Sequence, residues 1–131
     1  MVDHTGIDII AFNKKLNKRI GISVKSRTRT KGTEKTFVNI FRRDDNDRQK
    51  IIESNKAFAC GPWICVYVET ANYAHIYLLS LDHYDEKNRP NPDNKTDTWK
   101  MGEKNKQEYD KDSDLNYIKI LFDEKNWNCG D

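Results

Sequence analysis

A carboxylate and a lysine each interrupt an apolar segment near the start of this 131-residue chain. Asp8 stands inside IDIIAF, and Lys25 ends the run GISVK. A carboxylate among apolar residues is costly unless hydrogen bonds, a cation or a metal ion compensate it. If the two segments pair as a hairpin, Asp8 and Lys25 can meet across it. They would then form either a structural ion pair or the carboxylate and ammonium of a metal-dependent phosphodiester site.

The segment around Lys25 alternates in the manner of a strand. Side chains of an extended strand alternate between two faces, so Ser23, Lys25, Arg27 and Arg29 are expected on one side. The aliphatic residues between them are expected on the other side. The polar face is the part of the sequence in which chemistry is most concentrated.

GID at Asp8, followed by ISVKSRTR at residues 22–29, resembles the core of the PD-(D/E)XK nuclease superfamily, especially its Mrr-like and Holliday-junction-resolvase-like branches. In that superfamily an Asp on one strand is followed by an acid-x-Lys triplet on the next. The resemblance implies a restriction-endonuclease-like fold and Mg²⁺- or Mn²⁺-dependent endonuclease activity on DNA. Asp8 would be the metal carboxylate and Lys25 the catalytic lysine. Such a role suits Mg²⁺, which is commonly held by one or two carboxylates together with substrate phosphate oxygens.

The sequence departs from the family pattern at the first position of the triplet. Ser23 stands where the pattern has an acid, so a second metal carboxylate is expected from elsewhere, with Glu69 and Asp3 as the candidates. Ser23 is nevertheless expected to be the third catalytic residue, beside Asp8 and Lys25. The resemblance also implies contacts to DNA backbone phosphates from the cations that follow Lys25, namely Arg27, Arg29 and Lys31.

The net charge of +2 conceals an asymmetry. Residues 1–81 carry 14 basic and 8 acidic side chains, whereas residues 82–131 carry 9 and 13. Within residues 14–35 there are nine basic side chains and one acid, Glu34. Such a block can attract a polyanion, although for Lys14, Lys15 and Lys18 an ordinary solvated surface is the preferred interpretation.

Composition excludes several classes of protein. The mean hydropathy is −0.95, and the apolar runs are shorter than the roughly 18 residues that a membrane span needs. The N-terminus lacks the apolar run that a signal peptide would have, so a soluble, cytoplasmic protein is expected. The three cysteines lack CxxC spacing, which argues against a disulfide framework or a zinc knuckle.

Periodicity and turn residues predict a single domain, 1–131, of the α/β (α+β) class, with a mixed central sheet of about five strands flanked by helices. The strand over 63–69 is apolar almost throughout and is expected to be central and covered on both faces. A long polar surface loop is expected near 82–98. Strands are predicted at 7–12, 19–28, 36–41, 63–69, 74–81 and 117–122, and helices at 44–60 and 103–112.

In the superfamily a helix normally precedes the Asp strand, but only seven residues precede Asp8 here. The sheet face that this helix would cover is therefore expected to be open and apolar, and to be covered by formation of a homodimer.

Three functions remain open at this stage. The first is a Mg²⁺-dependent nuclease, and the second is a catalytically inactive nucleic-acid-binding module on the same fold. The third is a protein-interaction module in which Asp8 and Lys25 form only a buried pair. A metal site from His83 and Asp85 is conceivable, but a surface histidine is the preferred interpretation.

Overall fold

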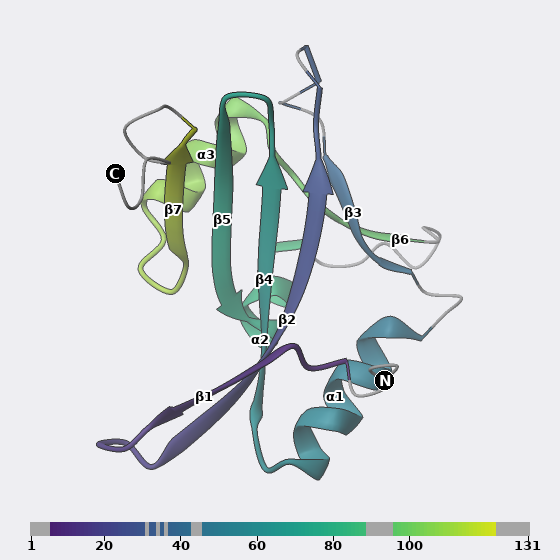
Figure 1. The fold of residues 1–131 in the computed structure, drawn as a ribbon, viewed down its shortest axis with the longest axis vertical. Helices are drawn as coiled ribbons and strands as arrows, with labels where there is room; N and C mark the ends of the chain where they lie inside the picture. Colours follow the sequence, from purple (N-terminus) through teal and green to yellow (C-terminus); the bar gives the residue numbers. More distant parts are fainter. Residues whose placement is uncertain are drawn as a thin grey trace, which may run out of the picture.

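Seven strands and three helices form within the part of the chain that the structure describes (Figure 1). The structure is a computed structural model, and it describes residues 6–30, 32–33, 35, 37–42, 46–88 and 96–122. The strands are β1 (Ile9–Asn13), β2 (Lys18–Thr28), β3 (Val38–Arg42), β4 (Gly61–Glu69), β5 (Tyr73–Ser80), β6 (Thr96–Trp99) and β7 (Asn116–Leu121). The helices are α1 (Asp47–Ala57), α2 (Leu81–Asn88) and α3 (Glu103–Asp110).

The predicted N-terminal hairpin is confirmed. β1 and β2 pair antiparallel, with Ile9 opposite Ile22. In the turn between them the Asn13 side chain accepts a hydrogen bond from the Leu16 amide, and Asn17 has a left-handed backbone conformation with φ of 49°. Asparagine favours turns for both of these reasons, so the turn chemistry is encoded locally.

Five strands form one mixed sheet in the order β1-β2-β4-β5-β7 (Figure 1). β2 and β4 run parallel, and the other neighbouring pairs are antiparallel. Parallel neighbours need a connection that crosses the sheet, and here that connection contains β3 and α1. The mixed central sheet of about five strands flanked by helices is therefore confirmed.

The strand predicted at 36–41 forms as β3, but it lies outside the main sheet. β3 pairs antiparallel with β6 in a separate two-stranded sheet, with an irregularity in register between Asn39 and Phe41. Val38, Ile40 and Phe41 are all buried, at 0–1% exposure. The small sheet therefore contributes core side chains to the domain.

All the covering elements pack on one face of the main sheet. On β4 this face is formed by Ile64, Val66 and Val68, each no more than 1% exposed. The same core cluster includes Ile51 of α1, Tyr84 of α2, and Trp99 and Tyr109 from β6 and α3. Trp99 stacks on Tyr109 with ring centroids 4.6 Å apart and an interplanar angle of 15°. Figure 1 shows α2 and α3 behind the sheet.

The opposite face of the sheet has no helix or strand over it among the described residues. The strand registers place a continuous apolar set there, which we call the open face: Val24, Cys65, Tyr67, Ile76, Leu78, Ile118 and Ile120. None of these seven side chains is buried, whereas Ile22 and Ala74, which the registers place on the same side, are 8% and 0% exposed. The expectation that β4 is covered on both faces is wrong for the described part of the chain, since Cys65 and Tyr67 are only half-buried.

The predicted loop at 82–98 differs most from the structure. The first part of this segment is helical (α2), and the last part is strand β6. Among the described side chains of α2 only Leu81 and Tyr84 are buried, each at 1% exposure. The helix therefore needs few apolar residues, and its sequence looks like that of a loop. Residues 89–95 lie outside the described part. No helix in the described ranges is long and apolar enough to cross a membrane.

The contact between α1 and β2 depends on a glycine. A Cβ atom at Gly21 would lie 2.2 Å from Oδ1 of Asn55 and 3.1 Å from Cδ1 of Ile7. Asn55 is 1% exposed, and its amide nitrogen donates to the carbonyl of Ile51. Because Asn55 is buried and hydrogen-bonded, it cannot move away cheaply.

We expect Gly21→Ala to lower the free energy of unfolding by about 1–3 kcal/mol, because an added methyl group overpacks this contact. Urea unfolding measures the change. Gly61→Ala is the matched control, since a Cβ there meets only the Arg19 carbonyl oxygen at 3.8 Å. Equal stability of the two variants would contradict the close approach of α1 to β2.

Candidate functional site

Asp8 lies one residue before β1 and next to β2, whereas Ser23 and Lys25 lie on the covered side of β2, in register with Ile64 and Val66. The β1–β2 register itself ends at Ile9, opposite Ile22. The Asp8 amide donates to the carbonyl of Ile22 at 2.9 Å. The hairpin therefore brings the three residues of the expected catalytic set into neighbouring positions.

Asp8 is exposed, and its carboxylate completes the backbone hydrogen bonding of β2. Oδ2 accepts a hydrogen bond from the Val24 amide at 2.7 Å, where the backbone of β1 no longer pairs with β2. Asp8 forms no ion pair with Lys25 or with any other described residue. Exposure and one hydrogen bond thus offset the cost of this carboxylate. A buried Asp8–Lys25 pair, the basis of the protein-interaction alternative, does not form.

The other candidate ligands do not join Asp8. Ser23 is 1% exposed, and its hydroxyl donates to the carbonyl of Gly6. Glu69 pairs with Thr28, five residues along β2 from Ser23, which corresponds to about 16 Å in a strand. Asp3 lies outside the described residues. Of the expected ligands that the structure describes, only Asp8 supplies a carboxylate here, which does not match the two-carboxylate metal set that the resemblance implies.

Lys25 and the two arginines lie along the edge of the covered face. Lys25 Nζ is 5.6 Å from the ring centroid of Phe41 on β3, a cation–π contact. Arg27 Nε donates to the carbonyl of Asn39, and Arg29 Nη2 donates to that of Phe37, each at 2.7 Å. Both guanidinium groups therefore connect β2 to the β3 segment. Lys31, the third expected phosphate contact, lies outside the described residues.

The turn end of the hairpin carries a second group of cations. β4 begins to pair with β2 at Ile20, so the hairpin extends past β4 as a two-stranded projection. We call residues 12–19 the hairpin arm; Figure 1 shows it projecting at the lower left. The arm carries four exposed cations, none of which forms an ion pair with a described residue: Lys14, Lys15, Lys18 and Arg19.

The arm also carries apolar side chains in solvent. Phe12 is 53% exposed and Leu16 is 63% exposed. Together with Lys18 and with Trp63 of β4, they line a hollow of about 660 Å³ at the base of the arm. The sequence signal for this surface is FNKKLNKR at residues 12–19, in which apolar residues flank the lysines although the segment is a turn.

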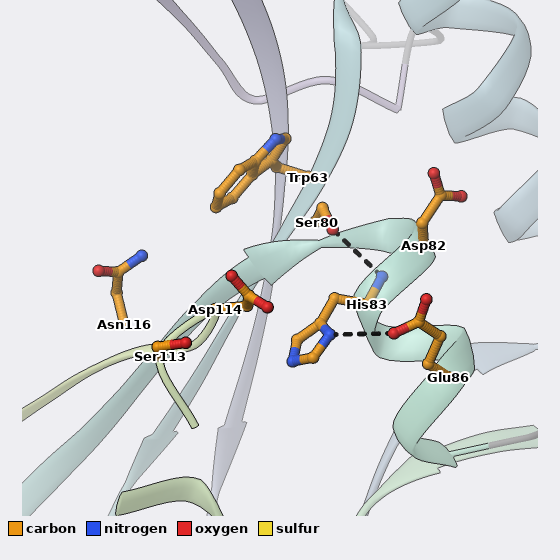
Figure 2. A pocket seen from close by; sticks show the side chains of 8 residues that line it. All are labelled: Trp63, Ser80, Asp82, His83, Glu86, Ser113, Asp114 and Asn116. Atoms are coloured by element: carbon orange, nitrogen blue, oxygen red, sulfur yellow. Dashed lines mark hydrogen bonds and ion pairs between the residues drawn. The ribbon is translucent and has the colours of Figure 1, made fainter. Parts of the chain in front are cut away.

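A third cluster joins α2 to the segment after α3. His83 Nε2 lies 2.6 Å from Asp112 Oδ2, and Lys87 Nζ lies 2.8 Å from the same oxygen. Figure 2 shows His83 with Glu86 and with Ser80, whose hydroxyl accepts the His83 amide, around a pocket of about 370 Å³. The His83 and Asp112 side chains are only 16% and 10% exposed.

These contacts shift both pKa values in the direction of an ion pair. The hydrogen bond to Asp112 raises the pKa of His83. Burial alone would raise the pKa of Asp112, but hydrogen bonds from Lys87, His83 and the Asp114 amide outweigh it and hold the pKa at about 2. Both shifts favour the charged forms, a protonated His83 and an ionised Asp112.

His83, Asp112 and Asp114 form the one group of three His, Cys, Asp or Glu residues in the described ranges whose ligand atoms lie within 4.8 Å of one another. The Lys87 ammonium already contacts Asp112 and would oppose a metal cation there. Asp85, which the sequence made a possible partner of His83, instead forms a two-pronged ion pair with Arg48 of α1. The cluster is therefore accounted for by ion pairing.

Comparisons of the chain with protein-family models, with curated proteins and with solved structures give no match. The resemblance to the nuclease superfamily, whose motif lies in the hairpin, therefore stays an expectation from the sequence.

The His83–Asp112 pair predicts a pH-dependent contribution to stability. Because the folded-state pKa of His83 is raised above its unfolded value of about 6.5, this contribution is complete below that pH and is lost as the pH rises through the folded pKa. We expect His83→Gln to cost on the order of 1 kcal/mol at pH 6 and less at pH 9, as measured by urea unfolding.

Glu86→Gln is the control, because Glu86 is 76% exposed and its contact with His83 is 3.4 Å long. This change should have a small effect at both pH values. A cost of His83→Gln that is the same at pH 6 and pH 9 would contradict the assigned pair.

Proposed function

We propose that this protein binds the sugar-phosphate backbone of a nucleic acid through the hairpin arm. The observation that carries the proposal is a group of four exposed cations on a projecting two-stranded ribbon, none with an acidic partner among the described residues: Lys14, Lys15, Lys18 and Arg19. Unpaired lysines gain affinity for a nucleic acid by releasing its condensed counterions. Paired β-strands are also an established shape for insertion into a nucleic-acid groove.

The apolar side chains of the arm add a second type of contact. Phe12 and Trp63 present aromatic surface beside Lys18, within the same hollow. Aromatic side chains next to a basic track stack on exposed bases and contribute about 1–3 kcal/mol per base. This function corresponds to the catalytically inactive binding module. The proposal differs from the expectation in where the phosphate contacts lie. They are assigned to the arm and not to Arg27 and Arg29, because those two guanidinium groups bind backbone carbonyls.

The test is fluorescence anisotropy with a labelled DNA duplex of about 20 base pairs and with its single strand, at several salt concentrations. We expect the Lys14→Gln, Lys15→Gln, Lys18→Gln triple variant to bind at least about 10-fold more weakly and to reduce the slope of log affinity against log salt by up to about 3.

The matched control removes three exposed lysines that lie on α1, on α3 and just after α3: Lys56→Gln, Lys104→Gln and Lys111→Gln. Both variants change the net charge equally, so the control should keep the affinity and the slope. The proposal fails if the wild type does not bind, or if both triple variants weaken binding equally. Tighter binding of the single strand would assign the main contact to Phe12 and Trp63.

A second candidate function is hydrolysis of the bound strand, as the resemblance implies. Asp8 is exposed and lies beside the β2 segment that carries Lys25, and neither side chain has an oppositely charged partner among the described residues. These two features support a phosphodiesterase, whereas the single carboxylate does not.

Incubation with plasmid and branched DNA in Mg²⁺ or Mn²⁺ tests this candidate. If this site is catalytic, cleavage falls at least about 100-fold in Lys25→Ala and in Asp8→Asn but persists in Lys100→Ala, an exposed lysine before α3. Cleavage by the wild type no greater than that by Lys25→Ala would exclude it.

A further inference from the structure

We propose that the open face of the sheet is the interface with a second copy of this chain. Its members come from β2, β4, β5 and β7 and form one continuous apolar surface. Within the registers that join these four strands, Glu69 at the end of β4 is the one charged residue on this side; Lys18, at the start of β2, lies on the same side but in the hairpin arm. The surface is therefore hydrophobic and almost uncharged.

The exposure of the individual side chains shows that the described part of the chain does not bury this surface. Ile118 is 57% exposed and Ile120 is 36% exposed. These two isoleucines are two residues apart and so lie on the same side of β7, a spacing that is typical of a strand face in a protein interior. On the central strands Cys65, Tyr67, Ile76 and Leu78 are half-buried, because neighbouring side chains on a sheet shield one another. Contiguous apolar surface of this kind marks an interaction site.

The dimensions of the face match those of a stable dimer interface. Four strands at a spacing of about 4.8 Å and about eight residues long cover roughly 500–600 Å² of flat area. A standard interface buries about 800 Å² on each partner. A second copy of the face is therefore large enough to cover it.

The distribution of polar residues favours self-association. The apolar centre of the face is bounded on β2 by Ser26 and Thr28, and on β5 and β7 by Ser80 and Asn116, whereas Ile22 and Trp63 extend it on β2 and β4. Interfaces commonly have this arrangement of an apolar centre and a polar rim. Two copies of a sheet have the same twist, so they can pack face to face with strands about 30° apart around a two-fold axis. The near absence of charge removes like-charge repulsion between identical faces.

Light scattering coupled to size exclusion, at protein concentrations from about 1 to 100 μM, tests the proposal directly, because these concentrations span typical weak-dimer affinities. The wild type should have twice the chain mass of 15.4 kDa at the high end. Ile76→Lys with Ile118→Lys should weaken dimerisation at least about 100-fold, because association would bury unpaired ammonium groups.

The control is Phe58→Lys, which places the same charge at a 47% exposed apolar residue just after α1, away from the open face. It should remain a dimer. Urea unfolding checks that each variant is folded, and the milder Ile118→Lys alone, at a 57% exposed position, replaces the double variant if the latter unfolds. A monomeric wild type at all concentrations, a dimer that survives the lysines, or equal dissociation of the control would each overturn the proposal.

Discussion

Two strands that run in the same direction cannot be joined by a tight turn, and in this protein β2 and β4 are such a pair. The chain between them must cross one face of the sheet, and crossovers of this kind are right-handed almost without exception, which fixes the face. β3 and α1 are therefore carried to that face, and β6, α2 and α3 pack around them. The layered structure, and the bare surface on the other side, both follow from this single pairing.

The crossover also changes what the cations of β2 do. Side-chain alternation alone places Lys25, Arg27 and Arg29 on one face, and this is correct. The same face is where β3 returns, so Lys25 meets the ring of Phe41 and the arginines meet backbone carbonyls. An arginine whose donors satisfy such carbonyls stabilises the connection between two sheets. The cations of β2 for which the structure describes no such partner, Lys18 and Arg19, lie on the hairpin arm, beyond the end of β4.

Local patterns are sufficient to predict much of this fold. The turn residues Asn13 and Asn17 and the flanking alternation encode the hairpin, and the order of elements predicts the mixed sheet. The pairing of β3 with β6 could not be predicted, because it joins segments far apart in the chain through a register that no local signal specifies. α2 was missed since its two buried side chains, Leu81 and Tyr84, are too few for a helical period. For the candidate site, the position of Asp8 beside β2 follows from the hairpin, whereas the separation of Glu69 from Asp8 requires the β2–β4 register.

The different environments of the tryptophans make the molecule its own spectroscopic reporter. Trp99 is fully buried and stacked on Tyr109, so the asymmetry of its surroundings should dominate the near-ultraviolet circular dichroism and disappear only when the core opens. Trp63 is half-buried beside the arm, where the wavelength and quenching of its fluorescence depend on solvent. With Trp127, which lies outside the described residues, replaced by phenylalanine, circular dichroism would follow the integrity of the core while emission followed events at the surface. The two signals could be recorded on one sample without an added label.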